Sequence, residues 1–480
     1  MGSKLKHSAL LTLGAILGVA VTIQFSALAQ KPVENGMPID SLRQLSSVYQ
    51  LIKSDYVEPV DNRKLLTQAT AGMVAALDPH SAYLDRKAYR ELREGTEGRF
   101  VGLGIEIGPS DDGYVKIVSP IEDSPAARAG IQAGDLIARI DGAAVKGMEL
   151  DEAIKRMRGE PHTKVVLTIV RQGAPGPLEI TITRDEIVQK SVKGRIIQSN
   201  GAGYAWVRVS QFQEPTVKDL AAKLAALARA EPHLKGLVLD LRNDPGGLLQ
   251  GAIGTAAAFL PPGAEIVSTN GQLEESKMHF YGRPEHYLFG RGDDPLKNVP
   301  ELFKTIPMVV LVNTGSASAS EIVAGALQDY RRAAIVGSPT FGKGSVQTIR
   351  PMANETAVKL TTARYYTPSG RSIQARGVVP DFPVDENADG DGLNALRMRE
   401  ADLQRHLSND RDREETTRKD DIEAQMRILV AERHRKPVEF GSDSDFQLAQ
   451  ALRHLQGLPV QLSKRAGSAD SPGPLAQQAR

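Results

Sequence analysis

The chain has 480 residues, of which 41% are hydrophobic and 24% are charged, and its formal net charge is +1. This length predicts about three globular domains at ~150 residues each, and the balanced charge argues against a nucleic-acid-binding protein, which usually carries a basic face. The chain contains no cysteine, which excludes disulfides, zinc–thiolate sites and cysteine nucleophiles.

The N-terminus has the pattern of an export signal. Lys4 and Lys6 precede an apolar stretch over residues 9–23, and Ala27-Leu28-Ala29 then supplies small residues for cleavage. The stretch is short for a membrane span, which needs roughly 20 apolar residues. We therefore expect residues 1–29 to be a cleaved signal peptide, with an uncleaved anchor as the alternative. In either case the rest of the chain is expected outside the cytoplasm.

Residues 37–98 are expected to be mainly helical, because large apolar side chains recur at helical spacing. One series lies between residues 42 and 52, and a second lies between residues 65 and 77, just before Asp78-Pro79. We interpret this region as a packing or dimerisation region.

Residues 99–187 change to short β-type runs, with one helix expected over residues 149–158. The expected strands cover residues 101–107, 115–118, 136–140, 165–170 and 178–183. This pattern predicts a small, mainly β domain.

Strands and helices alternate over residues 188–385. The apolar, strand-length runs cover residues 204–209, 236–241, 308–312 and 334–337, and helical stretches such as 217–228 and 321–328 separate them. This alternation predicts an α/β layer with a largely parallel sheet.

Residues 386–463 form a charged C-terminal region that we expect to be helical. Within it, residues 397–432 are rich in Arg, Asp and Glu and are expected to be exposed helix or disorder. Phe446–Leu455 has the pattern of a short amphipathic helix. Residues 464–480 are expected to be a disordered tail.

Two glycine-rich segments characterise the β region further. Gly102-Leu103-Gly104-Ile105 opens it, and Ser124-Pro-Ala-Ala-Arg-Ala-Gly-Ile-Gln-Ala-Gly-Asp-Leu-Ile137 follows. Together they resemble a PDZ domain, in which such a loop points backbone N–H groups at the carboxylate of a peptide C-terminus. The resemblance implies that Leu103, Gly104 and Ile105 supply these N–H groups. It also implies that Leu150, Ile154 and Met157 line the peptide groove. The alternative is that all of these are core residues of a small β domain.

Three serines, Ser316, Ser318 and Ser320, follow the apolar run 308–312. Ser318 and Glu321 have the spacing of a capping box, in which Ser318 would begin a helix. A serine at a helix N-terminus is also well placed for nucleophilic attack, because backbone N–H groups and the helix dipole stabilise developing negative charge. Spacing alone leaves both interpretations open and does not choose among the three serines.

Lys343 lies between two glycines in a loop that can deliver its amine to a serine. Residues 337–343 also fit the first seven positions of a nucleotide-binding P-loop. However, Gly344 replaces the Ser or Thr that binds Mg²⁺, and residues 345–349 are expected to be extended rather than helical. We therefore favour a catalytic lysine over a nucleotide site.

The sequence predicts no metal site. Residues 385–391 match the first half of an EF-hand calcium loop, but Leu396 stands where the bidentate Glu is required. The nine histidines are scattered and include no His-Glu-x-x-His motif. We expect neither a metal nor another cofactor.

Five segments in this order resemble the C-terminal processing (tail-specific) proteases, the PDZ-containing serine peptidases of family S41, over roughly residues 40–385. They are the PDZ signature, Asp240-Leu-Arg-Asn-Asp-Pro-Gly-Gly247, Gly315-Ser-Ala-Ser-Ala-Ser-Glu321, Phe341-Gly-Lys-Gly-Ser-Val-Gln347 and Tyr366-Thr-Pro-Ser-Gly-Arg-Ser-Ile-Gln374. The resemblance implies a multi-domain α/β (α+β) fold. It consists of a crotonase/ClpP-like α/β protease core with an inserted PDZ domain and helical N- and C-terminal regions.

The resemblance also assigns roles. It implies that Ser318 is the nucleophile, that Lys343 is the general base and that Gln347 orients the lysine. A lysine acts as a base only when it is neutral, and an ordinary lysine with a pKa near 10.4 is neutral in about one molecule in 2,500 at pH 7. We therefore expect desolvation to lower the pKa of Lys343, and we expect no carboxylate to lie against its amine.

Pro245-Gly246-Gly247 follows the apolar run 236–241, and such a turn exposes backbone N–H groups. It is either half of an oxyanion hole or simply a turn. The resemblance implies that the N–H of Ala319 and that of one of these glycines are the oxyanion donors. Gly246 is favoured, and Gly247 remains open.

The resemblance implies a serine endopeptidase that recognises the C-terminal tail of protein substrates through its PDZ domain and cleaves with a Ser/Lys dyad in the periplasm. Expected partners are proteins or peptides with accessible C-termini and, by family analogy, a lipoprotein adaptor and a second copy of the chain. The alternatives are an inactive PDZ scaffold and an α/β enzyme that acts on a non-peptide ester.

Overall fold

A computed structural model describes residues 38–463, except for 111, 122, 291, 389, 391–396 and 411–437. The expected signal peptide, residues 1–29, and the expected tail, residues 464–480, lie outside the described residues. The chain divides into two compact units, the first ending at Thr70 and the second beginning at Ala71. None of the helices in the described part combines the length and apolar character that a membrane span needs.

The first unit contains α2 (Ile39–Asp55) and the first turns of α3 (Asn62–Ala75). Asp40 in the first turn of α2 and Lys53 in its last turn complement the helix dipole. Most of the large apolar side chains of α2 are at least 43% exposed, namely Ile39, Leu42, Leu45, Val48 and Leu51, whereas Ile52 is half-buried. The expected helices are therefore present, while their role in packing or dimerisation stays a prediction.

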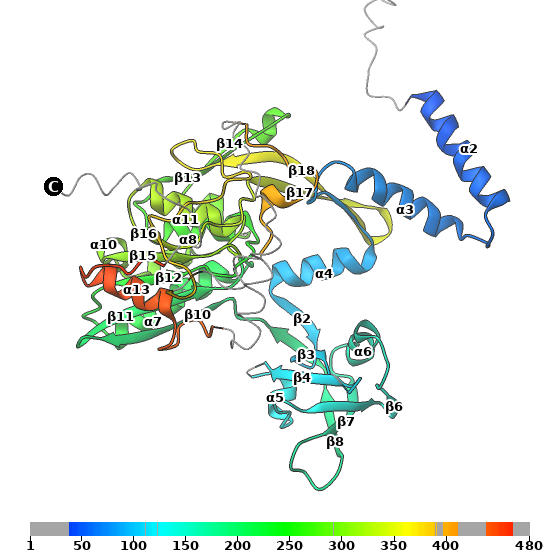
Figure 1. Ribbon diagram of the computed structural model, residues 1–480, viewed down its shortest axis with the longest axis horizontal. Coiled ribbons are helices and arrows are strands. Elements are labelled where there is room, and N and C mark those ends of the chain that lie inside the picture. The colour runs from blue at the N-terminus through cyan, green and yellow to red at the C-terminus, as the bar shows by residue number, and fades with distance from the viewer. Residues whose placement is uncertain are drawn as a thin grey trace, which may run out of the picture. The chain divides into compact units, whose positions relative to one another are not determined.

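The second unit contains an α/β core built on a six-stranded sheet with the strand order β10-β11-β12-β15-β16-β19 (Figure 1). The strands are β10 (Val192–Ser199), β11 (Ala202–Val209), β12 (Leu237–Asp240), β15 (Met308–Val312), β16 (Ala334–Gly337) and β19 (Phe382–Pro383). Neighbouring strands from β11 to β19 are parallel, and β10 pairs antiparallel with β11. The expectation of a largely parallel sheet is confirmed.

Helices cover both faces of this sheet. One face packs against α7 (Thr216–Ala230), α8 (Leu249–Ala257) and α11 (Ala319–Asp329), and the other packs against α13 (Phe446–Leu455). Short helices α9 (Pro284–Tyr287) and α10 (Leu302–Thr305) lie in the connections. In β12, Leu237 and Leu239 belong to the first cluster and Val238 to the second. Because both faces are buried, the central strands are apolar throughout.

A second, antiparallel sheet has the order β1-β18-β13-β14, with β17 also pairing β18. Its strands are β1 (Ala82–Leu84), β13 (Glu265–Gly271), β14 (Met278–Tyr281), β17 (Ser345–Met352) and β18 (Thr356–Tyr366). Residues 345–349 are extended as expected, so the helix that a P-loop requires after Gly344 is not there. β1 was not anticipated within the helical region; it forms because Ala82, Tyr83 and Leu84 pair with β18.

Residues 99–187 form the expected small β domain, drawn in cyan to green in Figure 1. Its sheet has the order β3-β4-β5-β7-β8, with β6 pairing β5. The elements are α4 (Arg86–Glu97) just before it, β2 (Arg99–Gly102), β3 (Ile105–Pro109), β4 (Val115–Pro120), α5 (Pro125–Arg128), β5 (Leu136–Ile140), β6 (Ala143–Ala144), α6 (Leu150–Met157), β7 (Lys164–Val170), β8 (Leu178–Thr183) and β9 (Asp185–Val188). The run expected as one strand over 101–107 is two strands, because Gly104 has φ +75° and turns the chain between them.

The C-terminal region agrees with expectation only in part. Helix α13 has the expected bounds. Residues 397–410, expected as exposed helix or disorder, are instead ordered and irregular apart from the 3₁₀ turn Glu400–Asp402, and Glu400 is fully buried. Its carboxylate lies 2.7 Å from His80 Nε2. A hydrogen-bond partner 320 residues away in the sequence contacts the buried carboxylate, and local charge patterning could not reveal it.

A buried ion cluster ties α13 to the end of β12. Arg242 Nη2 lies 2.6 Å from Asp240 Oδ2 and 2.6 Å from Asp445 Oδ2, and none of the three side chains is more than 1% exposed. Trp206 Nε1 donates to Asp240 Oδ2 at 3.2 Å. The Phe440 ring lies 4.1 Å from the Arg242 guanidinium. Removing one member would leave an uncompensated buried charge.

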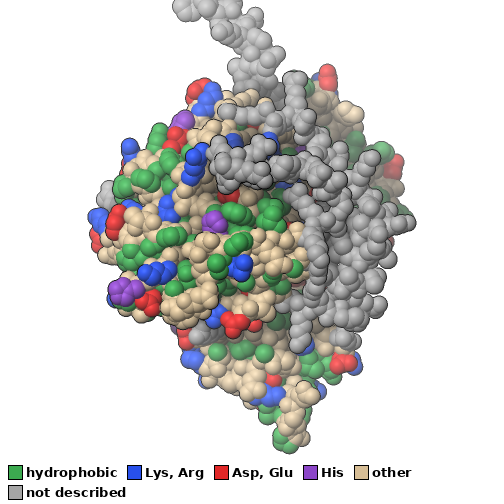
Figure 2. All heavy atoms as spheres, turned by 60° about the vertical axis from the view of Figure 1, so that its left-hand side comes forward, with side chains coloured by type: hydrophobic (Ala, Val, Ile, Leu, Met, Phe, Trp, Pro, Cys, Tyr) green, Lys and Arg blue, Asp and Glu red, His purple; other side chains and the backbone are tan. Residues whose placement is uncertain are grey.

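The surface contributes less to stability than these buried contacts. Acidic and basic side chains are interspersed on the face shown in Figure 2, in keeping with a net charge of +1. Exposed pairs such as Arg86–Glu355, at 2.9 Å, contribute at most about 1 kcal/mol.

We predict that Asp445→Ala lowers the free energy of unfolding by about 3–5 kcal/mol, because Arg242 then keeps its charge in the core with one partner fewer. Urea unfolding followed by the fluorescence of Trp206, the single tryptophan, measures this directly. Glu355→Ala is the control and should change stability by less than about 1 kcal/mol. Equal effects of the two variants would contradict a structural role for the cluster.

Candidate active site

Ser318 stands at a sharp turn between β15 and α11. Its φ of 56° and ψ of −110° lie in a region that non-glycine residues rarely adopt. Such strain persists only where the surroundings enforce it, and it is characteristic of functional sites. A strand-to-helix turn of this kind presents the serine hydroxyl at the end of a sheet.

The three serines are distinguished by what their hydroxyls contact. Ser316 Oγ donates to Leu241 O at 2.8 Å, and Ser320 Oγ donates to Asp244 O at 2.9 Å; both serines are fully buried. Ser318 is half-buried, and its hydroxyl accepts no capping bond from α11. Among the described side-chain hydrogen bonds, Ser316 and Ser320 use their hydroxyls as donors and Ser318 does not. This difference favours Ser318, while its role as the nucleophile stays a prediction.

Glu321 caps the N-terminus of α11 and also joins two segments. The buried Glu321 carboxylate accepts the N–H of Ser318 at 2.8 Å, that of Lys343 at 2.9 Å and that of Gly342 at 2.7 Å. It also accepts the Thr340 hydroxyl at 2.5 Å. Burial raises the pKa of Glu321 to about 7, and these four donors oppose the rise. One carboxylate therefore fixes the backbones of the serine turn and the lysine loop together.

Tyr365 on β18 is a second residue that links the serine turn to the lysine loop. Its buried hydroxyl lies within hydrogen-bond distance of Ser318 O, at 3.1 Å, and of Lys343 O. Burial raises the pKa of Tyr365 well above its usual range, and the charges of Glu321 and Glu400 add to the effect. The hydroxyl therefore stays protonated and can donate. Neither Tyr365 nor the bridging role of Glu321 was anticipated, because both depend on pairing between distant segments.

Lys343 has the electrostatic character of a base. Its pKa is lowered to about 8, mainly by desolvation on burial and secondly by the nearby cation Lys359. Glu400, Glu321 and Asp78 act in the opposite direction. None of the ion pairs found among the described residues includes Lys343. The pKa is thus set mainly by burial, which disfavours the ammonium form.

Gln347 lies on β17 at a bulge, four residues after Lys343. Its Nε2 donates to Ser345 Oγ at 3.0 Å and to Thr361 Oγ1 at 3.2 Å. In the described part of the chain, Oε1 takes part in none of the side-chain hydrogen bonds. The two hydroxyls fix the amide so that Oε1 is the group left for another donor.

The Pro-Gly-Gly turn packs directly against Ser318. A Cβ added to Gly246 would lie 2.9 Å from Ser318 Cβ and 3.0 Å from Ala319 N, and one added to Gly247 would lie 2.0 Å from Phe212 O. Only glycine therefore fits either position. The Gly246 N–H donates to Asp244 Oδ1 at 2.8 Å. The N–H groups of Gly247 and Ala319 donate to none of the turn and loop hydrogen bonds in the described residues.

The loop at residues 102–105 is the one expected to bind a peptide carboxylate. Its carbonyl groups accept hydrogen bonds, whereas its N–H groups donate none of the turn and loop hydrogen bonds in the described residues. Gly104 O accepts Ile121 N–H at 2.8 Å and the Ser124 hydroxyl at 3.1 Å. The N–H groups of Leu103, Gly104 and Ile105 are absent from the turn and loop bonds of the described part. β3 is an edge strand that pairs with β4 on one side. This geometry is open to an added peptide strand.

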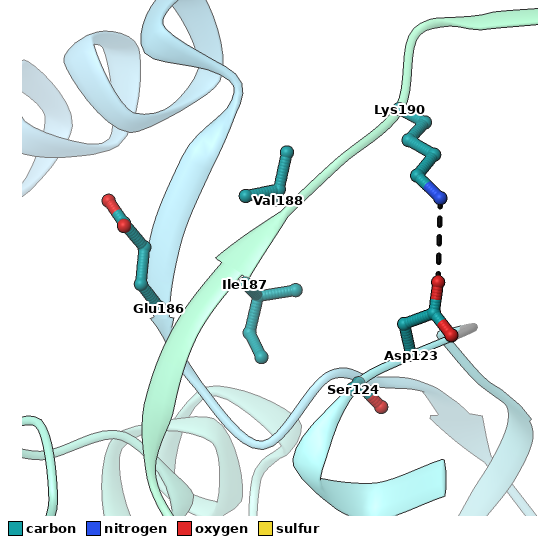
Figure 3. A pocket seen from close by; sticks show the side chains of 6 residues that line it. All are labelled: Asp123, Ser124, Glu186, Ile187, Val188 and Lys190. Atoms are coloured by element: carbon teal, nitrogen blue, oxygen red, sulfur yellow. Dashed lines mark hydrogen bonds and ion pairs between the residues drawn. The ribbon is translucent and has the colours of Figure 1, made fainter.

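Figure 3 shows a pocket of about 170 Å³ beside this loop, lined by Asp123, Ser124, Glu186, Ile187, Val188 and Lys190. Lys190 Nζ lies 3.5 Å from Asp123 Oδ2. The pocket is smaller than the ~300 Å³ typical of the smallest ligand sites. On α6, Met157 is 7% exposed and belongs to the domain core, while Leu150 and Ile154 are half-buried. The lining of a peptide groove by these three residues stays a prediction.

No group of three or more His, Asp or Glu residues among those described is arranged to hold a metal ion. The half EF-hand pattern at residues 385–391 lies partly outside the described residues.

Comparison with known proteins identifies the family. The profile of peptidase family S41 matches residues 203–384, that of the PDZ domain matches residues 116–171, and that of the activating protease CtpB N-terminal domain matches residues 15–88. A carboxy-terminal-processing protease of Bartonella bacilliformis is 44% identical over 375 residues, which cover 77% of this chain and 82% of that protein. The chain therefore belongs to the carboxy-terminal-processing proteases of peptidase family S41.

Two less similar proteins also carry the names of proteases. A probable CtpA-like serine protease of Staphylococcus aureus is 37% identical over 346 residues, which cover 72% of this chain and 65% of that protein. The solved structure of a photosystem II D1 C-terminal processing protease is 30% identical and covers 72% of this chain and 87% of its own, with a TM-score of 0.41. The family resemblance, the mixed α/β fold and the PDZ domain expected from the sequence are confirmed.

We predict that Tyr365→Phe lowers kcat about tenfold with little change in KM, because two backbone carbonyls lose the hydroxyl that holds them together. Steady-state hydrolysis of an unfolded protein substrate measures this. Tyr287→Phe is the matched control, since it removes another buried hydroxyl bond, 2.8 Å to Asp294, away from the serine turn. Wild-type kcat in the Tyr365 variant would show that Glu321 alone suffices.

Proposed function

We propose that this chain is an exported serine endopeptidase that cleaves protein substrates near their C-termini, with Ser318 as the nucleophile and Lys343 as the general base. The observation that carries the proposal is the joint attachment of both residues to one buried carboxylate, that of Glu321. Membership of the carboxy-terminal-processing proteases supports the reaction class.

In the proposed reaction, Ser318 Oγ attacks the peptide carbonyl carbon while the neutral Lys343 amine takes its proton. The carbonyl oxygen becomes an oxyanion, and the lysine then returns its proton to the departing amine. Water attacks the acyl-enzyme with the same lysine as base, which releases the second product and regenerates the hydroxyl. Gln347 Oε1 accepts a hydrogen bond from the lysine and orients it.

The oxyanion donors in this proposal are the N–H groups of Ala319 and Gly247. The sequence favoured Gly246, but its N–H already donates to Asp244 at 2.8 Å. Gly247 lies next in the same turn. Helix α11 begins at Ala319, so the positive end of its dipole adds to the stabilisation of the oxyanion.

A pKa of about 8 makes Lys343 usable as a base. At pH 7 about one lysine in ten is then neutral, compared with about one in 2,500 for an ordinary lysine. Glu321 has a pKa of about 7 and is mainly ionised above that value. A neutral Lys343 and an ionised Glu321 therefore coexist above pH 8.

The PDZ domain supports recognition of substrate tails. In this proposal a C-terminal carboxylate binds the N–H groups of Leu103, Gly104 and Ile105, and the tail pairs with the open edge of β3. The N-terminal signal pattern supports a periplasmic location, which cell fractionation would check.

We predict that Ser318→Ala and Lys343→Ala each reduce the hydrolysis of an unfolded protein with an apolar tail by at least about 1,000-fold, because nucleophile and base act as a unit. Lys277→Ala, which removes an exposed lysine, should leave the rate unchanged. Retained activity in either dyad variant would point to another nucleophile or to a non-peptide substrate, and an inactive wild type would point to a scaffold.

The same assay gives the pH dependence. Wild-type kcat/KM should rise about tenfold per pH unit below pH 8 and level off above it, because only the neutral Lys343 accepts a proton. A profile with no ionisation below pH 9 would contradict the assignment of the base.

We predict that Gly104→Ala raises KM about tenfold for a tail-bearing substrate, since the new Cβ would lie 2.2 Å from Ser124 Cβ and distort the loop. Gly142→Ala is the control: its φ is +78° as well, but nothing lies within 4 Å of its Cβ. A substrate with an amidated C-terminus should be turned over equally by both variants. Unchanged turnover of the carboxylate substrate by the Gly104 variant would rule out docking at this loop.

A further inference from the structure

Residues 397–410, hereafter the strap, contact two of the segments that build the candidate site. Arg397 Nη1 donates to Asn243 Oδ1 at 2.6 Å, just before the Pro-Gly-Gly turn. Arg399 Nε donates to Thr340 O at 3.1 Å, in the loop that leads to the lysine. The strap follows the family-profile match, which ends at residue 384.

Glu400 is the buried centre of the strap. Its N–H donates to Phe341 O at 3.0 Å, and its side chain is 1% exposed. Oε2 lies 2.7 Å from His80 Nε2, and Oε1 accepts Gln374 Nε2 at 2.8 Å. Gln374 Oε1 in turn accepts the N–H of Gly344 at 2.9 Å. A continuous chain of hydrogen bonds therefore runs from Glu400 to the residue that follows Lys343.

This arrangement fixes the backbone before and after the proposed base, Lys343. Glu321 binds the N–H groups of Gly342 and Lys343, and Glu400 reaches Gly344 through Gln374. A shift of about 1 Å in a catalytic group can lower the rate about 100-fold, so fixing three consecutive N–H groups has a direct catalytic value.

The electrostatic environment of Lys343 also involves Glu400. The charged groups that act on Lys343 are Lys359 on β18, Glu321 on α11, Asp78 before β1, and Glu400 on the strap. Burial and Lys359 lower the pKa of Lys343, and Glu400 is the strongest of the three carboxylates that raise it.

We propose that Glu400 is a positioning residue for the base: through Gln374 it fixes the loop that carries Lys343, and its charge acts on the lysine amine. The strap is then part of the peptidase site rather than an appended charged tail. The inference rests on the proposed role of Lys343 as general base.

The test of the charge is Glu400→Gln, which keeps the shape and the acceptor for Gln374 but removes the charge. The midpoint of the acidic limb of kcat/KM should move to lower pH by about half a unit, because the neutral lysine is then favoured. Glu274→Gln, an exposed glutamate, is the matched control and should leave the midpoint unchanged. An unchanged or higher midpoint in a Glu400→Gln protein with the wild-type melting temperature would overturn the electrostatic part.

The test of the positioning is Gln374→Met, which breaks the connection to Gly344 and leaves the charge of Glu400 in place. Here kcat on the pH plateau should fall about tenfold, while the midpoint stays where it is in the wild type. This variant decides the positioning role even if Glu400→Gln fails to fold. Wild-type kcat on the plateau would overturn the positioning role.

The variants distinguish failure of the proposed function from failure of the inference about the strap. Activity in Ser318→Ala or Lys343→Ala would overturn the proposed function itself. If those variants are inactive while Glu400→Gln and Gln374→Met behave as wild type, only the inference about the strap is lost.

Discussion

The site depends on one buried ion, the carboxylate of Glu321. A buried carboxylate without hydrogen-bond donors would cost several kcal/mol, so it must be surrounded by donors. Here the donors come from both the serine turn and the lysine loop: the N–H groups of Ser318, Gly342 and Lys343, and the hydroxyl of Thr340. Separating the two segments would strip the carboxylate of part of its solvation. The need to solvate one ion therefore fixes the relative position of the two backbones.

The sheet brings these segments to one place. β12 and β15 are parallel neighbours, so the Pro-Gly-Gly turn after β12 and the Ser318 turn after β15 lie at the same edge. Ligand sites of parallel sheets form at the carboxyl ends of the strands for this reason. The close approach of Gly246 to Ser318, which leaves no room for a Cβ, follows from that adjacency. The Arg242–Asp445 pair then joins the segment after β12 to α13 across the opposite face.

Much of the fold could be predicted, because apolar runs and helical spacing are local signals. The parallel strands and α13 were found in this way. The roles within the site were less accessible. Glu321 could be recognised only as the third residue of a capping box, since its other bonds reach residues about twenty positions away. The bond from the Gly246 N–H to Asp244, which led us to propose Gly247 as the oxyanion donor, could not be foreseen from the sequence. The sequence predicted that Glu400 belongs to an exposed charged run, because no local pattern indicates its hydrogen bonds to His80 and Gln374.

The pKa of Lys343 makes the proposed catalysis depend on the burial of the lysine. Burial is the main cause of the value of about 8, and the unperturbed value is 10.5. If the lysine loop became exposed to water, its neutral fraction at pH 7 would fall from about one in ten to about one in 3,000. The rate of the proposed proton transfer would then drop about 300-fold even with Ser318 unmoved. Loss of burial and loss of geometry would therefore both slow the proposed reaction.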